Sequence, residues 1–172
     1  MRRDLDSKFS VGLPYPQIRV DGKNERYAKL MMLNHAGMVS EFTAVTQYVY
    51  HETVLMEENP VISDALKGIA MVEMHHLQIL GELIVLLGGD PKYMIYKKKT
   101  PALWSPKFVE YGKTPKLALM QDIEGEKEAI AQYESTINQI DDENIIAIIK
   151  RIILDEEFHI KILTELYQKY VK

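Results

Sequence analysis

The stretch Glu73–Leu83, EMHHLQILGEL, returns with small changes as Glu156–Leu166, EEFHIKILTEL. In both copies a glutamate is followed by a histidine three residues later, and then by Ile, Leu, Glu and Leu at the same offsets. Residues three and four positions apart lie on one face of an α-helix, so each copy predicts a helix whose apolar face carries a glutamate and a histidine. A single Glu-x-x-His motif is common by chance, but two copies with matching neighbours indicate an internal repeat.

Apolar residues at helical spacing predict four long helices. Their approximate ranges are 24–56, 60–87, 115–140 and 142–170. Asn59 and Thr114 each precede a proline, which favours the first position of a helix. Asp141-Asp142 caps the fourth helix, and Gly88-Gly89 ends the second.

The connections between these helices predict how they are arranged. Short turns join the first helix to the second and the third to the fourth, which makes each pair antiparallel. Residues from about 90 to 113 contain prolines and no helical period, so they predict a crossover long enough to return along the bundle. Residues 1–23 predict an extended N-terminal arm. The expected fold is one all-α domain over residues 1–172, a four-helix bundle of two antiparallel pairs joined by a long crossover.

The composition excludes several classes of function. The 21 basic and 25 acidic residues give a net charge of −4, which is not the excess of positive charge by which proteins bind nucleic acid or anionic membranes. The chain has no cysteine, which excludes disulfides, thiolate metal sites and a thiol nucleophile. The N-terminus does not resemble a signal peptide, and we expect that no apolar run approaches the length needed to span a bilayer. We therefore expect a soluble, cytoplasmic protein.

Each predicted helix carries, near its middle, side chains that are costly to bury alone. These residues are Glu41, Glu73 with His76, Glu126, and Glu156 with His159. Glu41 and Glu73 are equally distant from the turn near residue 57, and Glu126 and Glu156 are equally distant from the turn near Asp141. Because a helix rises about 1.5 Å per residue, the four glutamates should lie at the same height along the bundle axis, near the centre of the bundle. The alternative is that these side chains are exposed polar positions.

Four carboxylates and two imidazoles at one level provide the charge and the ligand atoms for two divalent cations. Oxygen and imidazole ligands without sulfur favour Fe or Mn. One glutamate from each of two helices, together with a Glu-x-x-His motif from each of the other two, is the pattern known from ferritin-like di-iron and di-manganese proteins. We therefore expect two Fe or two Mn ions per chain.

Three further residues are candidates for supporting the metal site and its catalysis. Tyr48 and Tyr133 lie two helical turns beyond the carboxylates of the first and third helices, on the same face. From there they could donate hydrogen bonds to the opposing carboxylates. Asp155 could accept a hydrogen bond from the free ring nitrogen of His76. The alternatives are plain core tyrosines and an aspartate with a capping or surface role.

The chain resembles the ferritin-like superfamily and, within it, the rubrerythrins and the manganese catalases with their spore-coat-associated relatives. The stretches LPYPQIRVDGKNERYAKLMM and DIEGEKEAIAQYE are most similar to the latter group. The resemblance implies that Glu73 and Glu156 bridge two metals. It also implies that Glu41 and Glu126 each bind one metal, as do the histidines of the two motifs.

The chain also departs from these families. Ala129 stands where rubrerythrins carry a further metal-facing glutamate, and the cysteine-bound rubredoxin domain that usually accompanies them is absent from this sequence. Manganese catalases are usually longer, with a C-terminal tail that these 172 residues do not include. The resemblance therefore specifies a superfamily more closely than an activity.

Three functions stay open. The first is an oxidoreductase that decomposes or reduces hydrogen peroxide, as a catalase or a peroxidase does. The second is a ferroxidase that oxidises Fe(II) for storage or detoxification. The third, of a different class, is a structural or coat protein that the metals only stabilise. For the enzymes, the expected partners are a small-molecule oxidant, hydrogen peroxide or oxygen, and further copies of the chain in a homo-oligomer.

Overall fold

A computed structural model describes residues 8–97 and 100–171 of the chain. The first seven residues of the predicted N-terminal arm therefore lie outside the described part. The elements follow one another as α1 (Glu25–Ala36), α2 (Glu41–Leu55), α3 (Pro60–Leu86), β1 (Met94–Lys97), β2 (Thr100–Leu103), a 3-10 helix η1 (Pro106–Phe108), α4 (Pro115–Ile137) and α5 (Glu143–Tyr170).

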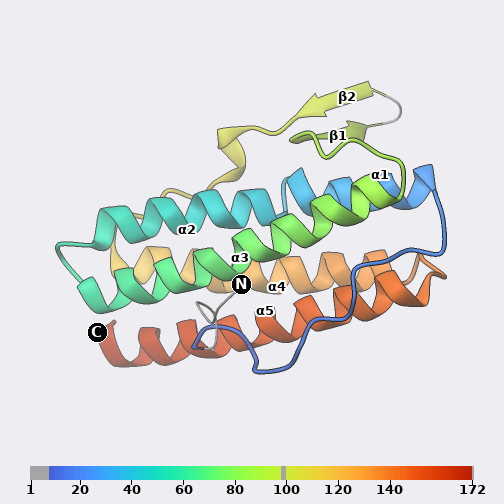
Figure 1. Ribbon diagram of the computed structural model, residues 1–172. Helices are drawn as coiled ribbons and strands as arrows, with labels where there is room; N and C mark the ends of the chain where they lie inside the picture. The colour runs from blue at the N-terminus through green and yellow to red at the C-terminus, as the bar shows by residue number, and fades with distance from the viewer. Residues whose placement is uncertain (1–7, 98–99, 172) are drawn as a thin grey trace.

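The helices form the predicted bundle (Figure 1). α2 packs against α3, α4 packs against α5, and α1 also packs on α3. Each tight pair is joined by a short turn, and the two pairs are joined by the chain between α3 and α4, which crosses the molecule. The all-α fold class, with two antiparallel pairs and a long crossover, is confirmed.

The predicted helix starts are present as well. The side chain of Asn59 accepts a hydrogen bond from the N–H of Ile62 at the start of α3, and Thr114 caps α4 in the same way. Asp142 caps α5 by accepting hydrogen bonds from the N–H groups of Asn144 and Ile145. These caps fix where α3, α4 and α5 begin, and hence the level at which their central residues lie.

The first predicted helix is wrong in one respect, because it is two helices. A Cβ atom at Gly37 would lie 2.4 Å from the carbonyl oxygen of Leu33, so the chain needs a glycine where α1 ends. Ser40 then starts α2, since its hydroxyl accepts a hydrogen bond from the N–H of Thr43. The break places Glu41 in the first turn of α2, where the partial positive charge of a helix N-terminus stabilises a carboxylate.

The crossover carries a β-hairpin that the sequence did not predict. β1 and β2 pair in antiparallel register, with Met94 opposite Leu103. The following Trp104 donates from its indole nitrogen to the hydroxyl of Thr43, at 2.9 Å, and its ring contacts Phe42 edge-on. These contacts hold the crossover on the outer face of α2.

The apolar core is divided into two clusters along the bundle. One includes Ile79, Leu80, Leu83, Ile145, Ile149 and Ile152. The other includes Leu55, Ile62, Leu66, Ile69, Leu119 and Leu163. On both α3 and α5, the Glu-x-x-His motif lies between the members of the two clusters. The polar residues are therefore enclosed by apolar packing on either side.

α3 is also long and apolar enough to cross a membrane, by length and composition alone. The expectation that no apolar run reaches that length was therefore too strict. Half of the most apolar 18-residue window is buried inside the protein, and the middle of the helix holds Glu73 and His76. Both features are those of a core helix in a bundle.

Candidate metal centre

The six predicted ligand residues meet between the two apolar clusters, on four different helices. They are Glu41 from α2, Glu73 and His76 from α3, Glu126 from α4, and Glu156 and His159 from α5, and each is at most 3% exposed. They form two groups, in each of which one ligand atom per residue lies within 4.8 Å of all the others: Glu41, Glu73, His76 and Glu156; and Glu73, Glu126, Glu156 and His159. The groups share Glu73 and Glu156, the two residues expected to bridge a metal pair.

Each histidine points one ring nitrogen at the glutamates. Nδ1 of His76 lies 3.0 Å from Oε2 of Glu73 and 3.3 Å from Oε1 of Glu156. Nδ1 of His159 lies 2.9 Å and 3.2 Å from the other oxygens of the same two glutamates. Each nitrogen also approaches the third carboxylate of its group, at 3.7 Å and 3.3 Å respectively. The internal repeat of the sequence is thus a near-symmetry of the site.

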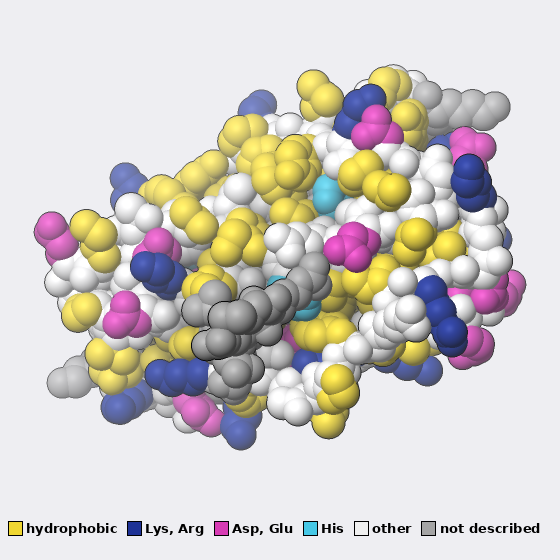
Figure 2. All heavy atoms as spheres, viewed as in Figure 1, with side chains coloured by type: hydrophobic (Ala, Val, Ile, Leu, Met, Phe, Trp, Pro, Cys, Tyr) yellow, Lys and Arg dark blue, Asp and Glu magenta, His cyan; other side chains and the backbone are white. Residues whose placement is uncertain are grey.

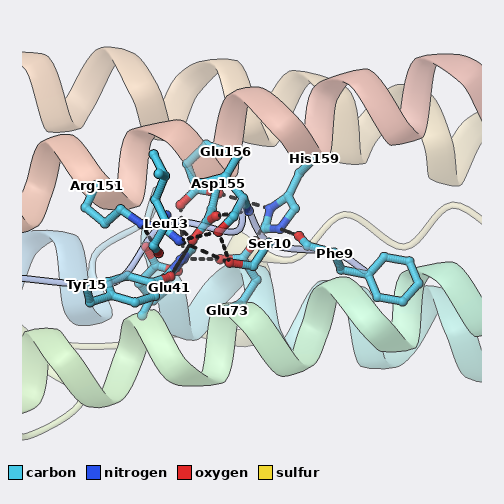
Figure 3. Close-up of polar contacts among 12 residues, drawn as sticks. Phe9, Ser10, Leu13, Tyr15, Glu41, Glu73, Arg151, Asp155, Glu156 and His159 are labelled. Atoms are coloured by element: carbon cyan, nitrogen blue, oxygen red, sulfur yellow. Dashed lines mark hydrogen bonds and ion pairs between the residues drawn. The ribbon is translucent and has the colours of Figure 1, made fainter. Parts of the chain in front are cut away.

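The partners of Nε2, the ring nitrogen of each histidine that points away from the glutamates, indicate which ring nitrogen carries the hydrogen. Nε2 of His159 lies 3.0 Å from the carbonyl oxygen of Phe9, which only accepts hydrogen bonds (Figure 3). Nε2 of His76 lies 3.2 Å from Oδ2 of Asp155, an anionic acceptor. In a neutral ring the hydrogen is then on Nε2, and Nδ1 carries a lone pair that faces carboxylate oxygens. This arrangement is repulsive unless a cation lies between them or the ring takes up a second proton.

The glutamate oxygens also need a cation or a proton beside them. Oε1 of Glu73 and Oε1 of Glu156 are buried and have no hydrogen-bond partner among the described residues. Leaving an anionic oxygen buried without a donor is costly. Cations bound between the carboxylates and the two Nδ1 atoms would satisfy all of these atoms at once. The donor set, four carboxylates and two imidazoles, therefore fits two metal ions.

Without cations, the electrostatics of the site favour the uptake of protons. Burial, followed by the charges of the neighbouring carboxylates, raises the pKa of Glu41 and of Glu126 well above the ordinary value. Burial opposes the charged form of the two histidines, but the surrounding glutamates outweigh it and raise both pKa values. Burial also acts to raise the pKa of Glu73, yet the charges of the histidines and their hydrogen bonds lower it.

Tyr48 and Tyr133 connect the two helix pairs across the site. Tyr48 on α2 donates its hydroxyl hydrogen to Glu126 on α4, and Tyr133 on α4 donates to Glu41 on α2. Both expected hydrogen bonds to opposing carboxylates are therefore present, while a catalytic role stays a prediction. Burial, and the charge of the carboxylate that each faces, raise the pKa of both tyrosines well above the ordinary value, so both keep their protons.

Asp155 lies behind His76, in the predicted place, and is completely buried. Its carboxylate also accepts from the N–H of Val11 at 2.8 Å and from the hydroxyl of Tyr15, and it pairs with Nη1 of Arg151 at 2.7 Å. Burial works against its charge, but the hydrogen bond and charge of His76, helped by Tyr15 and Arg151, lower the pKa of Asp155. The alternative of a surface or capping aspartate does not apply.

The N-terminal arm covers the histidine side of the site (Figure 3). Arg151 holds it there by donating to the carbonyl oxygens of Leu13, at 3.0 Å, and Val11, at 2.8 Å. The guanidinium lies 4.1 Å from the ring centre of Tyr15, whose hydroxyl lies 3.0 Å from Nε2 of His76. Sequence reasoning missed Tyr15, and with it the role of Arg151 on α5, because the arm that contains Tyr15 has no helical period from which its contacts could be predicted.

Phe9 anchors the other end of the arm. Its carbonyl oxygen contacts His159, and its ring lies over α3 at Gly68, where a Cβ atom would come within 2.2 Å of the ring. Gly68 therefore makes room for the arm. A glycine inside a helical pattern is unfavourable unless packing requires it, so Gly68 was a signal in the sequence that something packs closely there.

A second buried polar cluster lies one helical turn from Glu126 along α4. Nδ1 of His51 is 2.8 Å from Oδ1 of Asp122, and Gln47 donates to the same oxygen at 3.0 Å. Nε2 of His51 and Oδ2 of Asp122 have no hydrogen-bond partner in the described chain. No role was predicted for this cluster from the sequence, although Asp122 lies four residues before Glu126 and so on the same face of α4.

A cavity of about 550 Å³ opens onto the carboxylate side, between α2 and α4. The polar side chains at its inner end include Glu41, Tyr48, Glu73, Glu126, Tyr133 and Glu156. Its walls include Ala44 and Gln47 from α2, and Gly125 and Ala129 from α4. Neither motif histidine lines it. The site is thus open towards α2 and α4, and covered by the arm towards α3 and α5.

The match to known proteins agrees with this geometry. The rubrerythrin family model matches residues 33–167, which include all six residues of the two groups. The chain belongs to the rubrerythrin family. In this family member, the cavity wall includes Ala129.

Individual relatives of this rubrerythrin-family chain point to the same superfamily. A probable manganese catalase of Clostridium acetobutylicum is 25% identical over 171 residues, covering 89% of this chain and 75% of its own length. The crystal structure of KatB, a manganese catalase from Anabaena, has a TM-score of 0.84 at 22% identity, covering 94% of this chain and 80% of KatB. A bacterioferritin of Rhodobacter capsulatus, described as having a dinuclear site, has a TM-score of 0.69 at 20% identity, covering 86% and 89%. The structural likenesses show that the ferritin-like fold is shared.

Proposed function

We propose that this protein binds two Fe or two Mn ions per chain and uses them to decompose hydrogen peroxide. The observation that carries the proposal is the pair of ligand groups that share Glu73 and Glu156 at the inner end of a cavity. The two shared glutamates would bridge the ions. The other glutamate and the histidine of each group would complete the coordination of one ion. The similarity to a probable manganese catalase and to KatB supports this activity.

The residues around the site have separable tasks. A bound pair of redox-active ions would supply two electrons to one peroxide molecule and recover them from another. Tyr48 and Tyr133 hold the terminal carboxylates of the two groups from across the bundle. Asp155 and the carbonyl of Phe9 keep Nδ1 of each histidine directed inward, and the arm keeps water from that side. The cavity admits the substrate on the carboxylate side.

Disproportionation is the simplest peroxide chemistry for this chain. Its 172 residues contain no cysteine, so they supply no thiolate-bound iron to deliver electrons. In disproportionation, hydrogen peroxide serves both as oxidant and as reductant. We therefore expect the protein loaded with Mn or Fe to evolve one oxygen molecule for every two peroxide molecules without added reductant.

An oxygen electrode tests this proposal. The metal-loaded wild type is compared with Glu156→Ala, which removes a shared carboxylate, and with Glu157→Ala, which removes the exposed carboxylate beside it. Oxygen evolution by the wild type and Glu157→Ala, and none by Glu156→Ala, is the expected result. A fully metal-loaded wild type that evolves no oxygen would exclude catalase activity.

A ferroxidase is the second candidate, and the mouth of the cavity favours it. Glu110, Glu124 and Glu128 line the outer part of the cavity and are exposed, and among the described residues that line it only Lys107 balances their charge. An acidic mouth attracts divalent cations such as Fe(II).

Rapid oxidation of added Fe(II) in air, by a protein that evolves no oxygen from peroxide, would favour this candidate. Metal-loaded protein inactive in both assays would point to the structural role.

We also propose that the protein acts in the cytoplasm as a homo-oligomer. Figure 2 shows hydrophobic side chains mixed with charged ones over the face on which α3 and α5 lie. On α3, Val61, Met74, Val85 and Leu86 are each at least 43% exposed. Such side chains gather where copies of a chain contact one another. Light scattering coupled to size-exclusion chromatography would measure the mass, and a strictly monomeric mass would contradict the proposal.

A further inference from the structure

The cavity is far larger than hydrogen peroxide requires. Its volume is about 550 Å³. A water molecule in the liquid occupies about 30 Å³, and hydrogen peroxide has only one oxygen atom more. Pockets of roughly 300–1,000 Å³ hold organic ligands of many atoms. The space beyond the glutamates therefore suits a substrate with a substantial organic part.

Gly125 keeps this space open. It lies in the middle of α4, where a glycine costs about 0.8–1.0 kcal/mol relative to alanine. A Cβ atom there would meet one neighbour, Nε2 of Gln47, at an ordinary distance of 3.9 Å. Packing therefore does not require a glycine at this position, and the helix carries the cost without a steric reason. What the missing side chain preserves is the width of the cavity, to which Ala44 and Ala129 also contribute.

Part of the cavity wall is apolar and held in position. Met38, Val39 and Phe108 line the cavity, and Met38 is 62% exposed. Gln132 fixes the segment between α1 and α2 by donating to the carbonyl oxygen of Val39 at 2.6 Å. A hydrocarbon group that entered the cavity would contact these side chains while its polar end lay near the glutamates.

The charges of the cavity select against anions. Three exposed glutamates lie at its mouth, where Lys107 is the one basic residue among the described lining residues, while the four buried glutamates at its inner end would be balanced by two divalent ions in the loaded protein. An organic substrate with a free carboxylate would be repelled along this route. A neutral substrate would not.

We propose that the cavity admits neutral organic hydroperoxides as oxidising substrates of the dinuclear site. This inference rests on the proposed function. The O–O bond of the hydroperoxide breaks, and two electrons and two protons convert its halves to an alcohol and water. Hydrogen peroxide supplies both electrons and both protons and is oxidised to oxygen. One organic hydroperoxide and one hydrogen peroxide thus give one alcohol, one water and one oxygen.

The test measures reduction of cumene hydroperoxide by the metal-loaded protein in the presence of hydrogen peroxide, which supplies the electrons, and compares it with the disproportionation of hydrogen peroxide alone. Gly125→Leu places a side chain in the cavity, and Ala131→Leu, on the exposed side of α4, is the matched control. We expect the ratio of kcat/KM for cumene hydroperoxide to that for hydrogen peroxide to fall at least tenfold in Gly125→Leu and to stay unchanged in Ala131→Leu. A cumene hydroperoxide carrying a ring carboxylate should react at least tenfold more slowly than the neutral compound.

A binding measurement gives a readout independent of turnover. Cumyl alcohol, the reduction product, should show nuclear relaxation enhanced by Mn(II) in the loaded wild type, and Gly125→Leu should abolish this enhancement. Circular dichroism and metal content verify that the variant is folded and loaded, and Ala129→Leu replaces it if it is not.

The outcomes separate the two proposals. Turnover of hydrogen peroxide without turnover of cumene hydroperoxide overturns this inference and leaves the proposed function standing. No turnover of either compound overturns both. An unchanged ratio of kcat/KM in a folded, loaded Gly125→Leu also overturns the inference, as do equal rates for the neutral and anionic compounds.

Discussion

Tyr133 and Tyr48 make equivalent hydrogen bonds to different halves of the site, so they form a matched pair. Tyr133→Phe removes the donor to Glu41, and Tyr48→Phe removes the donor to Glu126. Loss of such a partner typically costs about 10- to 100-fold in metal affinity or activity. Calorimetric titration with Mn(II) should show one of the two ions weakened in each variant. Equal weakening of both ions, or none, would mean that the tyrosines do not support separate ions.

Asp155 is the residue through which the arm, α3 and α5 are connected. Asp155→Asn leaves the buried guanidinium of Arg151 without its charge partner. Breaking a buried ion pair costs about 3–5 kcal/mol, so the free energy of unfolding should fall by that amount. Urea denaturation measures it, with the exposed Asp141→Asn as the control. A loss no larger than that of the control would show that the pair contributes little.

At the scale of residues, the sequence predicts the residues that recur at helical spacing, but not the contacts of the irregular N-terminal arm. The central glutamates and histidines follow from helical spacing, because a polar residue at an otherwise apolar position of the buried face can be placed along the helix from its residue number. Tyr15, Arg151 and the carbonyl of Phe9 do not, since their contacts join positions more than 60 residues apart. A backbone carbonyl also has no side-chain identity by which a sequence could single it out.

At the scale of elements, the break between α1 and α2 sets the position of Glu41. Ser40→Ala removes the N-cap of α2, which should cost about 1 kcal/mol of stability. Because the next residue is Glu41, the variant should also bind metal less tightly. Ser135→Ala, an exposed serine within α4, is the control for both measurements. Lower stability with unchanged metal affinity would show that the cap does not position the carboxylate.

The same break shows why element boundaries were only partly predictable. The apolar seam continues from α1 into α2, so the periodicity alone predicts one helix. The signals for a break, Gly37 and Ser40, were present, but a glycine within a helical pattern does not by itself end the helix. The hairpin Met94–Leu103 was missed because its two strands are short and β1 packs on α1, which is distant in the sequence. The capped starts of α3, α4 and α5 were predicted, since each cap acts within its own turn.

At the scale of the whole molecule, the site should couple folding to pH with opposite signs in the two metal states. Without metal, the folded-state pKa values of Glu41, Glu126 and both histidines are raised, so the folded chain holds more protons than the unfolded chain. The free energy of unfolding should therefore fall as pH rises from about 5 to about 7. Glu73 and Asp155, with lowered pKa values, contribute stability that is lost only at lower pH.

Metal binding should reverse this slope. Ligands must be deprotonated to bind a cation, so protons compete with the metals and the loaded protein should gain stability as pH rises over the same range. Thermal unfolding of both forms across that range measures the two slopes. Parallel profiles would mean that the glutamates do not act together inside the bundle.

The central claim is a pair of metal ions held by shared glutamates. Its most direct measurement is the metal content of protein purified from cells and dialysed, determined by elemental mass spectrometry. The wild type and Glu157→Ala should each retain about two Fe or Mn ions per chain, and Glu73→Ala and Glu156→Ala should lose the pair, because each removes an oxygen donor common to both ions. Two ions retained in either of those variants, or none in the wild type after reloading, would contradict the account.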